Sequence, residues 1–524
     1  MKTSRQVVQL LPIVILAVLL LGGCAAQRGS GPTPKVAAAD QAAQLRWLER
    51  MSWGANVGDA SQLAKDGLPI WLRDQLHPGP ARLPAAAQAQ IDAMVISQTP
   101  VEQLAMTLEA QRKATDALPD EDQKKAARQA YQQQLQRLLR ESQQRFLIRA
   151  LYSPNQLQEQ MTWFWMNHFS VNARKDNIRA LIGDYEENAI RPHALGRFRD
   201  LLGATVRHPA MLRYLDNAQN ATGRINENYA RELMELHTLG VGGGYSQGDV
   251  QELARVLTGV GVTSLAADAP PPNVRPALRG DYVRQGLFEF NPNRHDYGPK
   301  TLFGQPMAQR GLAETDEALD RLARAPATAR FVSTRLAMYF VADVPPPVLV
   351  DRMSATFKRS DGDIAAVLTA MFESPEFAAL LGGKFRDPVH YAIGSVRLAY
   401  DDRVATDLNP LIGWIARMGE PLYGHETPDG YPLTQDAWAS AGQMATRFEI
   451  ARAIGTGGVV LFRTEDKAPL EKPAFPSYPP LAESSAVRAR IPSFGAGTRD
   501  ALAQAKTPQE WNTFLLASPE NMHR

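Results

Sequence analysis

A short segment, residues 226–259 (NENYARELMELHTLGVGGGYSQGDVQELARVLTG), gathers several side chains that could do chemistry. At about 100° per residue, Asn228, Arg231, Glu232 and Glu235 fall on one face of a helix. Carboxylates three residues apart on a helix can share a cation, and one of them can act as a general base where burial raises its pKa. The spacing makes these four residues candidates for catalysis or for ligand binding.

The same helix also has a purely structural interpretation. Glu227 and Arg231 are four residues apart, as are Arg231 and Glu235, and such pairs stabilise an exposed helix by roughly 0.2–0.5 kcal/mol each. The opposite face carries an apolar stripe formed by Tyr229, Leu233 and Leu236. A surface helix with these ion pairs on its exposed face would explain the pattern without any function, so the residues alone leave both interpretations open.

A glycine cluster, Gly240 and the run 242–244, follows this helix and is typical of a helix end with left-handed or open backbone. Ser246 then predicts the start of a second helix, and Asp249 three residues later resembles the partner of a capping box. A glycine-rich loop before a helix N-terminus can also bind an anion. No strand is expected before this loop and no Lys-Ser/Thr follows it, so helix termination is the favoured interpretation. The loop also lacks the alternating Asp/Asn ligands of an EF-hand.

Histidines supply the remaining candidate chemistry. His295 stands beside Asp296, and a His-Asp pair can orient a base, although the setting also fits a plain turn. His168 ends an aromatic-rich helical segment. None of the nine histidines lies three or four residues from another, and Met234 stands where a Glu-x-x-His motif ending at His237 would need glutamate. No HExxH, Gly-x-Ser-x-Gly, Walker or Rossmann motif is present, so the sequence identifies neither a metal nor a cofactor.

The N-terminus, MKTSRQVVQLLPIVILAVLLLGGCAAQ, has the layout of a secretory leader. Lys2 and Arg5 form its basic region, and the apolar run 7–21 is short and wrongly flanked for a membrane span. Leu-Gly-Gly-Cys at 21–24 resembles the bacterial lipobox, in which the thiol takes a diacylglyceryl group. Cys24 is the only cysteine in 524 residues, which excludes a disulfide framework. An ordinary signal peptide with an incidental cysteine is the alternative.

Lipidation would decide where the protein resides. Several acyl chains on one residue give stable anchoring, whereas one chain gives only marginal binding. Ala25, rather than aspartate, follows the cysteine, as in lipoproteins of this type that reach the outer membrane. The sequence predicts a lipid-anchored protein of the cell envelope, on the outer membrane and facing the periplasm. Its first partner would be the lipid bilayer, through acylated Cys24.

The charge balance excludes another class of partner. The chain has 57 basic and 55 acidic residues, and removing residues 1–23 takes away Lys2 and Arg5 and leaves 55 of each. A nucleic-acid-binding domain carries a basic patch and a high isoelectric point. We therefore expect no nucleic-acid partner.

The pattern along the chain predicts a mainly α fold, a multi-helical globular body with a small irregular or hairpin insertion near 261–304. Residues 85–150 consist largely of strong helix formers, and 120–151 are expected to form one long helix with solvated charges. Ser153 is expected to cap the next helix, whose apolar stripe is expected in the core. Alternation over 286–303 indicates a short hairpin, the one place where strands are expected.

The domain organisation follows from changes in composition and in Pro and Gly content. About 500 residues with 44% hydrophobic side chains can bury a large core. The predicted parts are a leader (1–23), a flexible tether (24–40), an N-terminal helical lobe with the 226–259 segment (41–260), a Pro-rich loop with a possible hairpin (261–304), a C-terminal helical lobe (305–464), a Pro-rich excursion (465–496) and terminal helices (497–524).

The segment 226–259 is also similar to the signature of a bacterial family known as "domain of unknown function 1800". Further blocks resemble the family in the same order, over most of the chain from about residue 45: ERMSWGANVGDASQLAKDGLPIWLRDQLHP, FWMNHFSV, IRPHALGRFRDLL, HPAMLRYLDNAQN, NRHDYGPKTLFG, APATARFVSTRLAMYFV and GYPLTQDAWAS. The resemblance implies an exported, predominantly helical bacterial protein. It also implies a neighbouring gene for an exported protein similar to sulfatases and alkaline phosphatases, but no established activity.

Two departures from the family pattern bear on chemistry. Members often carry histidine where this chain has Met166, and often His-Pro where it has Ala325-Pro326. If those histidines bind a metal in relatives, this chain lacks them.

Two functional hypotheses remain. The first is an envelope lipoprotein that acts as a helical binding or assembly scaffold, with an exported sulfatase-like protein as a possible partner. The second is a periplasmic hydrolase that uses Glu232, Glu235, His168 and the His295–Asp296 pair around one cleft, with or without a divalent metal. The two differ in one respect: the hydrolase needs these side chains to converge with Asn228 and Arg231.

Overall fold

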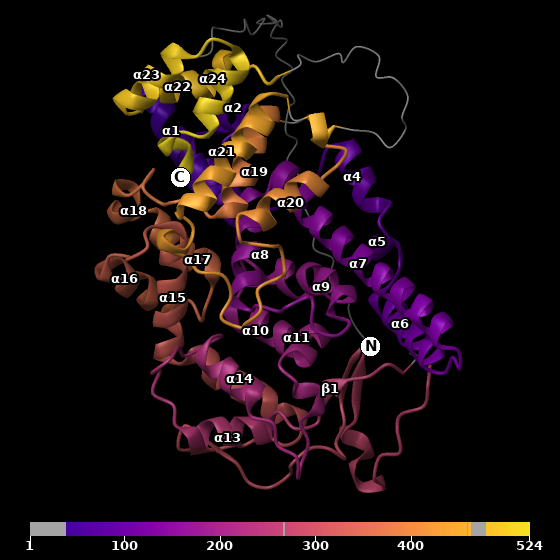
Figure 1. The fold of residues 1–524 in the computed structure, drawn as a ribbon. Coiled ribbons are helices and arrows are strands. Elements are labelled where there is room, and N and C mark those ends of the chain that lie inside the picture. The colour runs from indigo at the N-terminus through magenta and orange to yellow at the C-terminus, as the bar shows by residue number, and fades with distance from the viewer. Residues whose placement is uncertain (1–37, 266–267, 402, 458, 463–477) are drawn as a thin grey trace, which may run out of the picture. The chain divides into compact units, whose positions relative to one another are not determined.

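The computed structural model describes residues 38–265, 268–401, 403–457, 459–462 and 478–524. The predictions for the leader, Cys24, most of the tether and much of the Pro-rich excursion lie outside these residues. Ala38–Arg524 form one compact unit, which contains both predicted lobes. The structure is 63% helical and 4% strand, which confirms the mainly α fold (Figure 1). Within the described ranges, no helix combines the length and the apolar character that a membrane crossing requires.

The helices before the strand-containing insertion belong to the predicted N-terminal lobe. They are α1 (Ala38–Met51), α2 (Val57–Asp66), α3 (Leu68–Leu76), α4 (Ala85–Asp92), α5 (Val95–Gln98), α6 (Val101–Asp116), α7 (Glu121–Tyr152), α8 (Gln156–His168), α9 (Ile182–Asp184), α10 (Phe198–Arg207), α11 (Pro209–Tyr214), α12 (Asn228–Glu235) and α13 (Gln247–Val256).

The helices after the insertion bring the chain back beside α1, which α22 contacts (Figure 1). They are α14 (Leu312–Arg324), α15 (Pro326–Phe340), α16 (Pro347–Arg359), α17 (Ile364–Phe372), α18 (Pro375–Ala379), α19 (Pro388–Tyr400), α20 (Asn409–Arg417), α21 (Ala441–Gly455), α22 (Ser485–Arg490), α23 (Ala496–Gln504) and α24 (Pro508–Leu516). One large buried hydrophobic cluster includes side chains from α1 and α24, and a second, smaller cluster lies between α6 and α7.

The long helix predicted over 120–151 is α7, and the Asp120 side chain caps it by accepting from the Gln123 N–H at 2.8 Å. The expectation that its charges are solvated holds only for the first half. Glu141 and Arg145, in the second half, are buried. The reason is tertiary packing, because α8, α9, α19 and α20 all contact α7.

The next helix, α8, supplies the middle of the core. Its predicted apolar stripe is buried throughout, at Leu157, Met161, Phe164 and Trp165. The helix begins at Gln156 rather than beside Ser153, which instead ends α7 through a 2.8 Å bond from its N–H to the Arg149 carbonyl. The capping residue predicted for the start of α8 therefore closes the helix before it.

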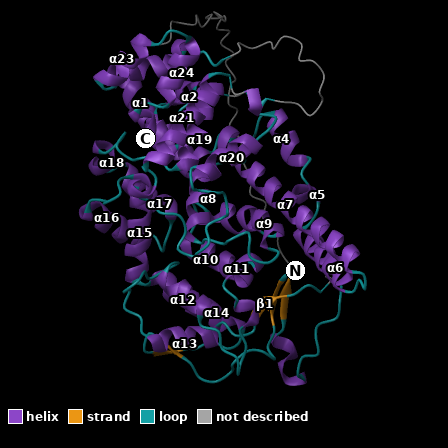
Figure 2. Ribbon diagram, in the orientation of Figure 1, coloured by secondary structure: helices purple, strands orange, loops and turns teal. Residues whose placement is uncertain are grey.

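The strands of the described part of the chain lie between residues 260 and 306, and of these β3 and β4 fall within the predicted alternation over 286–303 (Figure 2). The hairpin β2 (Val283–Gln285) and β3 (Phe288–Phe290) is antiparallel, and β1 (Val260–Val262) pairs with the other edge of β3, Val260 opposite Phe290. A second ribbon joins β4 (Thr301–Leu302) to β5 (Gln305–Pro306). The insertion thus contains a small sheet with the strand order β1-β3-β2, whose strand β1 contacts α11. The second ribbon contacts α13 through β4.

Candidate functional site at the end of helix α12

A cavity of about 530 Å³ opens where α12 ends and α15 passes. We call it the α12–α15 cleft. Its lining comes from the end of α12, the glycine loop, α15 and one loop residue, namely Glu235, Leu236, Leu239, Gly240, Val241, Gly242, Gly243, Ala327, Arg330, Phe331, Thr334, Arg335 and Asp429.

Helix α12 has the two faces that its sequence predicts. Tyr229 and Leu233 are buried, whereas Arg231, Glu232 and Glu235 are only partly buried on the other face. The Arg231 guanidinium lies 3.1 Å from the Glu227 carboxylate and 3.5 Å from that of Glu235, which confirms both predicted pairs. Such partly exposed pairs contribute little to stability, about 0.2–1 kcal/mol each. Their effect here is to fix the charged face beside the cleft.

The glycine loop that follows α12 packs so closely against α15 that a side chain has no room at Gly240. Gly240 has φ +82°, and a Cβ built on it would lie 2.7 Å from Cδ2 of Phe331 in α15. Both the left-handed backbone and the close approach of an aromatic ring therefore require glycine. The predicted capping box is present after the loop, with the Ser246 and Asp249 side chains each bonded to the other's backbone N–H.

Glu232 lies next to the cleft rather than in its lining. Its carboxylate has no hydrogen-bond or ion-pair partner among the described residues. Burial raises the pKa of Glu232, and the negative charge of Glu235 raises it further, while Arg231 lowers it. Asp429 also raises it, so three carboxylates lie close enough to act on one another.

Asp429 belongs to the loop 424–431, which the sequence marks only as a loop. Its carboxylate accepts from the Thr427 hydroxyl at 2.5 Å and lies 3.2 Å from Nε2 of His425. Asn167 of α8 holds the end of this loop, because its Oδ1 accepts a hydrogen bond from the Tyr431 N–H at 2.6 Å. The amide of Asn167, one residue before the end of α8, thereby places Asp429 at the cleft.

Arg335 faces the same cavity from α15. Its guanidinium is partly buried, and within the described chain no carboxylate or carbonyl bonds to it; its Nε is buried without a partner. Burial lowers the pKa of Arg335, and the negative charge of Asp429 partly offsets this. Arg330, one turn earlier, differs because its guanidinium lies 2.5 Å from the Asp351 carboxylate. An unpaired guanidinium at a cavity is the strongest polar feature of this site.

His168 lies beneath the cleft and does not line it. Its ring is buried and packs 5.9 Å from Phe331, which does line the cleft. Nε2 donates to the His237 carbonyl at 3.0 Å, and Nδ1 is buried without a partner. Burial holds the pKa of His168 well below its usual range, so the ring is neutral.

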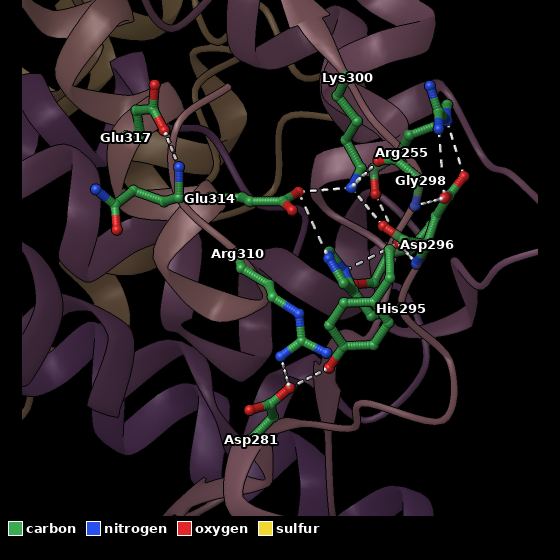
Figure 3. A network of polar contacts seen from close by, with 12 residues as sticks. Arg255, Asp281, His295, Asp296, Gly298, Lys300, Arg310, Glu314 and Glu317 are labelled. Carbon is green, nitrogen blue, oxygen red and sulfur yellow. Dashed lines mark hydrogen bonds and ion pairs between the residues drawn. The ribbon is translucent and has the colours of Figure 1, made fainter. Parts of the chain in front are cut away.

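His295 and Asp296 lie in a different network, between the strand insertion and α14 (Figure 3). The Asp296 carboxylate bonds to the Arg255 guanidinium at 2.8 Å, so it does not orient the neighbouring imidazole. Nδ1 of His295 donates to the Thr258 carbonyl at 2.8 Å, and Nε2 lies 3.5 Å from the Glu314 carboxylate. The bonds to Arg255 and Thr258 join this segment to the end of α13, and the contact with Glu314 joins it to α14.

Lys300 completes that network. Its ammonium lies 2.6 Å from Glu314, and its side chain is fully buried. The same ammonium donates to the Asp296 and Gly298 carbonyls. Lys300 and Glu314 therefore form a buried ion pair, which we call the ionic lock.

The structure thus divides the predicted residues. Glu235 lines the cleft, and Arg231 and Glu232 share its helix face. Asn228 begins the same helix, and its amide donates to the Leu215 carbonyl at 3.2 Å. His168 lies below, and His295 and Asp296 share no hydrogen bond or ion pair with the α12 residues in the described part of the chain. Nor do three or more Asp, Glu, His or Cys side chains gather there in a group that could hold a metal ion.

Sequence reasoning missed Arg335 and Asp429 as site residues. Arg335 carried one available signal, because it interrupts an otherwise apolar face of the FVSTRLAMYFV stretch. Asp429 stands with His425 and Glu426 among the turn residues of GHETPDGYP, which the sequence predicts to be a loop, and only packing on Asn167 brings that loop to the cleft. The two departures from the family pattern are elsewhere: Met166 is buried, and Ala325 caps α15.

Comparison with known proteins gives a family and nothing more specific. A family model described as "Protein of unknown function (DUF1800)" matches residues 46–523. No curated protein and no solved structure matches the chain. The match covers most of the sequence and says nothing about chemistry.

Proposed function

Because the chain belongs to the DUF1800 family, whose function is unknown, we propose a function from the cleft itself: a lipid-anchored binding protein of the cell envelope that holds an anionic, partly apolar ligand in the α12–α15 cleft. Arg335 is the residue that recognises the anion. The ligand's apolar part lies against the walls formed by α12 and α15.

The observation that carries this proposal is the unpaired guanidinium of Arg335. Taking a charge out of water without a partner costs several kcal/mol in a dry interior and less where water still reaches it. Folded proteins therefore pair buried arginines, as Arg191 and Glu159 are paired here. A partly buried arginine that faces a cavity without a partner is explained if a ligand supplies the anion.

The walls of the cleft suit a ligand with an apolar part. Leu236, Leu239 and Phe331 line it, and Val241 on its rim is 80% exposed. Small-molecule sites are concave and mostly apolar, with a few polar groups that fix orientation. The cavity of about 530 Å³ is within the size range of such sites.

The envelope part of the proposal rests on the leader and Cys24. An acylated Cys24 followed by a short tether would hold the helical body, which begins at Ala38, close to the membrane surface. The cleft would then face the compartment in which an exported sulfatase-like partner also resides. In this arrangement the protein presents its ligand, or itself, to that partner as a scaffold.

The test uses the mature chain with Cys24→Ala and the aromatic sulfonate 8-anilinonaphthalene-1-sulfonate as the probe. We expect one saturable site in a fluorescence titration. Arg335→Gln should weaken binding roughly 10- to 100-fold, the loss typical of a hydrogen bond to a charged group. Arg352→Gln is the matched control, because that arginine is paired with Glu376 outside the cleft. Equal binding by Arg335→Gln and the unmutated chain, with both folded by circular dichroism, would overturn the proposal.

A hydrolase is the second candidate, favoured by the raised pKa of Glu232 beside Glu235. His168, His295 and Asp296 do not reach the cleft, so the carboxylates would have to act without them. Metal analysis of the mature chain and of Glu235→Ala distinguishes the branches. Stoichiometric metal that disappears in Glu235→Ala would favour a metal-dependent hydrolase, whereas little metal in both would remove that form.

A further inference from the structure

Charges of both signs face the α12–α15 cleft without neutralising each other. Arg335 and Asp429 both line it, and the negative charge of Asp429 acts on Arg335, yet they form no ion pair. Two opposite charges in one cavity that do not pair with each other are both available to a ligand. The cavity leaves room for a ligand between the two groups.

The acidic side of the cleft carries more charge than its own arginine can balance. Glu235 and Asp429 line the cavity, and Glu232 lies close to both. Among the described residues, Arg231 pairs with Glu235 but is shared with Glu227 outside the cleft, and the His425 imidazole lies 3.2 Å from the Asp429 carboxylate, while Glu232 has no such partner. Excess negative charge therefore remains on this side, and it favours a cationic group.

Apolar side chains line the same cleft as the charged groups. Phe331 lies on α15 one turn before Arg335, and Leu236 follows Glu235 directly in the chain. A hydrocarbon chain in contact with these side chains would be removed from water, at roughly 0.8 kcal/mol per buried CH₂ group.

We propose that the ligand is an ammonium–carboxylate zwitterion with a short apolar spacer, its carboxylate on Arg335 and its ammonium among Glu235, Asp429 and Glu232. This deepens the proposed function and rests on it. The carboxylate accepts from the guanidinium fork, which fits it in a bidentate manner. The ammonium donates to carboxylates that otherwise have few or no partners.

Other ligand charges satisfy only part of the site. A simple anion would leave the three carboxylates unneutralised, and a polyanion such as a nucleotide would be repelled by them. A simple cation would leave Arg335 without a partner. Only a ligand with both charges neutralises the site, and an apolar spacer keeps the two ends apart.

The experiment is a calorimetric titration with three matched compounds: 6-aminohexanoate, hexanoate and hexylamine. The mature chain with Cys24→Ala should bind 6-aminohexanoate on the order of tenfold more tightly than either singly charged compound. Arg335→Gln should reduce the affinity for 6-aminohexanoate to that for hexylamine. Asp429→Asn should reduce it to that for hexanoate.

Several outcomes separate this inference from the proposal beneath it. If the sulfonate probe binds through Arg335 but hexanoate binds as tightly as 6-aminohexanoate, the zwitterion inference is wrong and the proposed function stands. If none of these compounds binds, both fail. Because Asp429 also holds Thr427 and His425, Glu235→Gln serves as a second acidic variant, and Arg352→Gln should leave all affinities unchanged.

A last arm distinguishes a free small molecule from a chain end. Nα-acetyl-lysine carries the same ammonium and carboxylate at a similar separation, and its amide lacks the carboxylate. Binding of Nα-acetyl-lysine but not its amide indicates a site that accepts a peptide ending in lysine. Binding of 6-aminohexanoate alone indicates a free amino acid-like ligand.

Discussion

The Tyr423 hydroxyl donates a hydrogen bond of 2.5 Å to Oε2 of Glu186, and both side chains are fully enclosed in the core. Glu186 belongs to a π-helical turn, Tyr185–Ile190, and Tyr423 has φ +58°, an uncommon conformation for a bulky residue. The Ala173 N–H holds this backbone by donating to the Tyr423 carbonyl at 2.9 Å. A buried carboxyl group is thereby kept with a neutral hydroxyl as its hydrogen-bond partner.

This burial makes stability depend on pH. Burial raises the pKa of Glu186 from 4.5 to about 7, and the Tyr423 bond and the Arg145 charge offset only part of the effect. Between these pH values the folded protein keeps a proton that the unfolded chain loses, so its stability falls as pH rises from about 4.5 to 7. The fall attributable to Glu186 is about 3 kcal/mol. Urea denaturation of Glu186→Gln should therefore lose less stability between pH 5 and pH 8 than the unmutated chain does.

Tyr423→Phe is the control for this interpretation. It keeps the Glu186 carboxyl but removes the hydrogen bond that favours the ionised form, so the pKa of Glu186 should rise further. The pH range of falling stability should then extend upward. If Glu186→Gln and the unmutated chain lose equal stability over this range, Glu186 does not titrate as described.

The second prediction concerns the cost of an unpaired charge. Arg335→Leu should stabilise the protein by about 1 kcal/mol at pH 7, because it removes a partly buried guanidinium that has no partner. Arg330→Leu on the same helix should change stability by less and in the unfavourable direction, since it breaks an exposed pair with Asp351. Thermal denaturation of both variants measures this. A less stable Arg335→Leu would show that the arginine has a stabilising partner after all.

Sequence reasoning succeeded where the cause of a structure lies within a few residues. The capping box at Ser246 and Asp249 and the Arg231 ion pairs depend on side chains one helical turn apart, so spacing alone predicts them. The long helix α7 follows from its run of helix formers. Local alternation over 286–303 predicts β3 and β4, whereas β1 and β2 lie outside that range, and β1 pairs with a strand some 30 residues away.

The sequence does not predict side-chain contacts in which the partner comes from a distant segment of the chain. His295 and Asp296 are adjacent in sequence, yet their side chains bond to Glu314 and Arg255 respectively. The candidate site shows this most clearly, because only the fold brings Asp429 to the cleft that Arg335 also lines. Of the candidate residues, the sequence could therefore supply the helix face of α12 but not the groups opposite it.

The third prediction tests the close approach at the glycine loop. Gly240→Ala should destabilise the protein by roughly 2–4 kcal/mol, because the new Cβ meets both a left-handed backbone and the Phe331 ring at 2.7 Å. Gly242→Ala is a matched control, since Gly242 has a similar φ of +79° and open space around its Cβ. It should cost only about 1 kcal/mol. Equal losses in the two variants would mean that the Phe331 contact is not tight.

The fourth prediction separates the ionic lock from the cleft. Glu314→Gln leaves the buried Lys300 ammonium without its carboxylate, so it should destabilise the protein by about 3–5 kcal/mol. Asp296→Asn should cost less, because its bond to Arg255 is partly exposed and Glu252 still pairs with that arginine. Neither change should alter binding of the sulfonate probe to protein that remains folded. A selective loss of binding in Asp296→Asn would instead return Asp296 to the functional site.

The last prediction concerns attachment to the membrane. In cells fed a labelled fatty acid, the full-length chain should incorporate label and Cys24→Ala should not, because a thiol at that position is the acceptor in the lipobox that this leader resembles. The label should resist detergent extraction from the precipitated protein, as a covalent bond does. Fractionation should place the unmutated chain with membranes, and the Cys24→Ala body, once its leader is removed, with soluble proteins. Equal labelling of the two chains would remove the lipid anchor from the proposed function. The ligand-binding part of the proposal would still be tested separately, by binding of the sulfonate probe to Arg335→Gln.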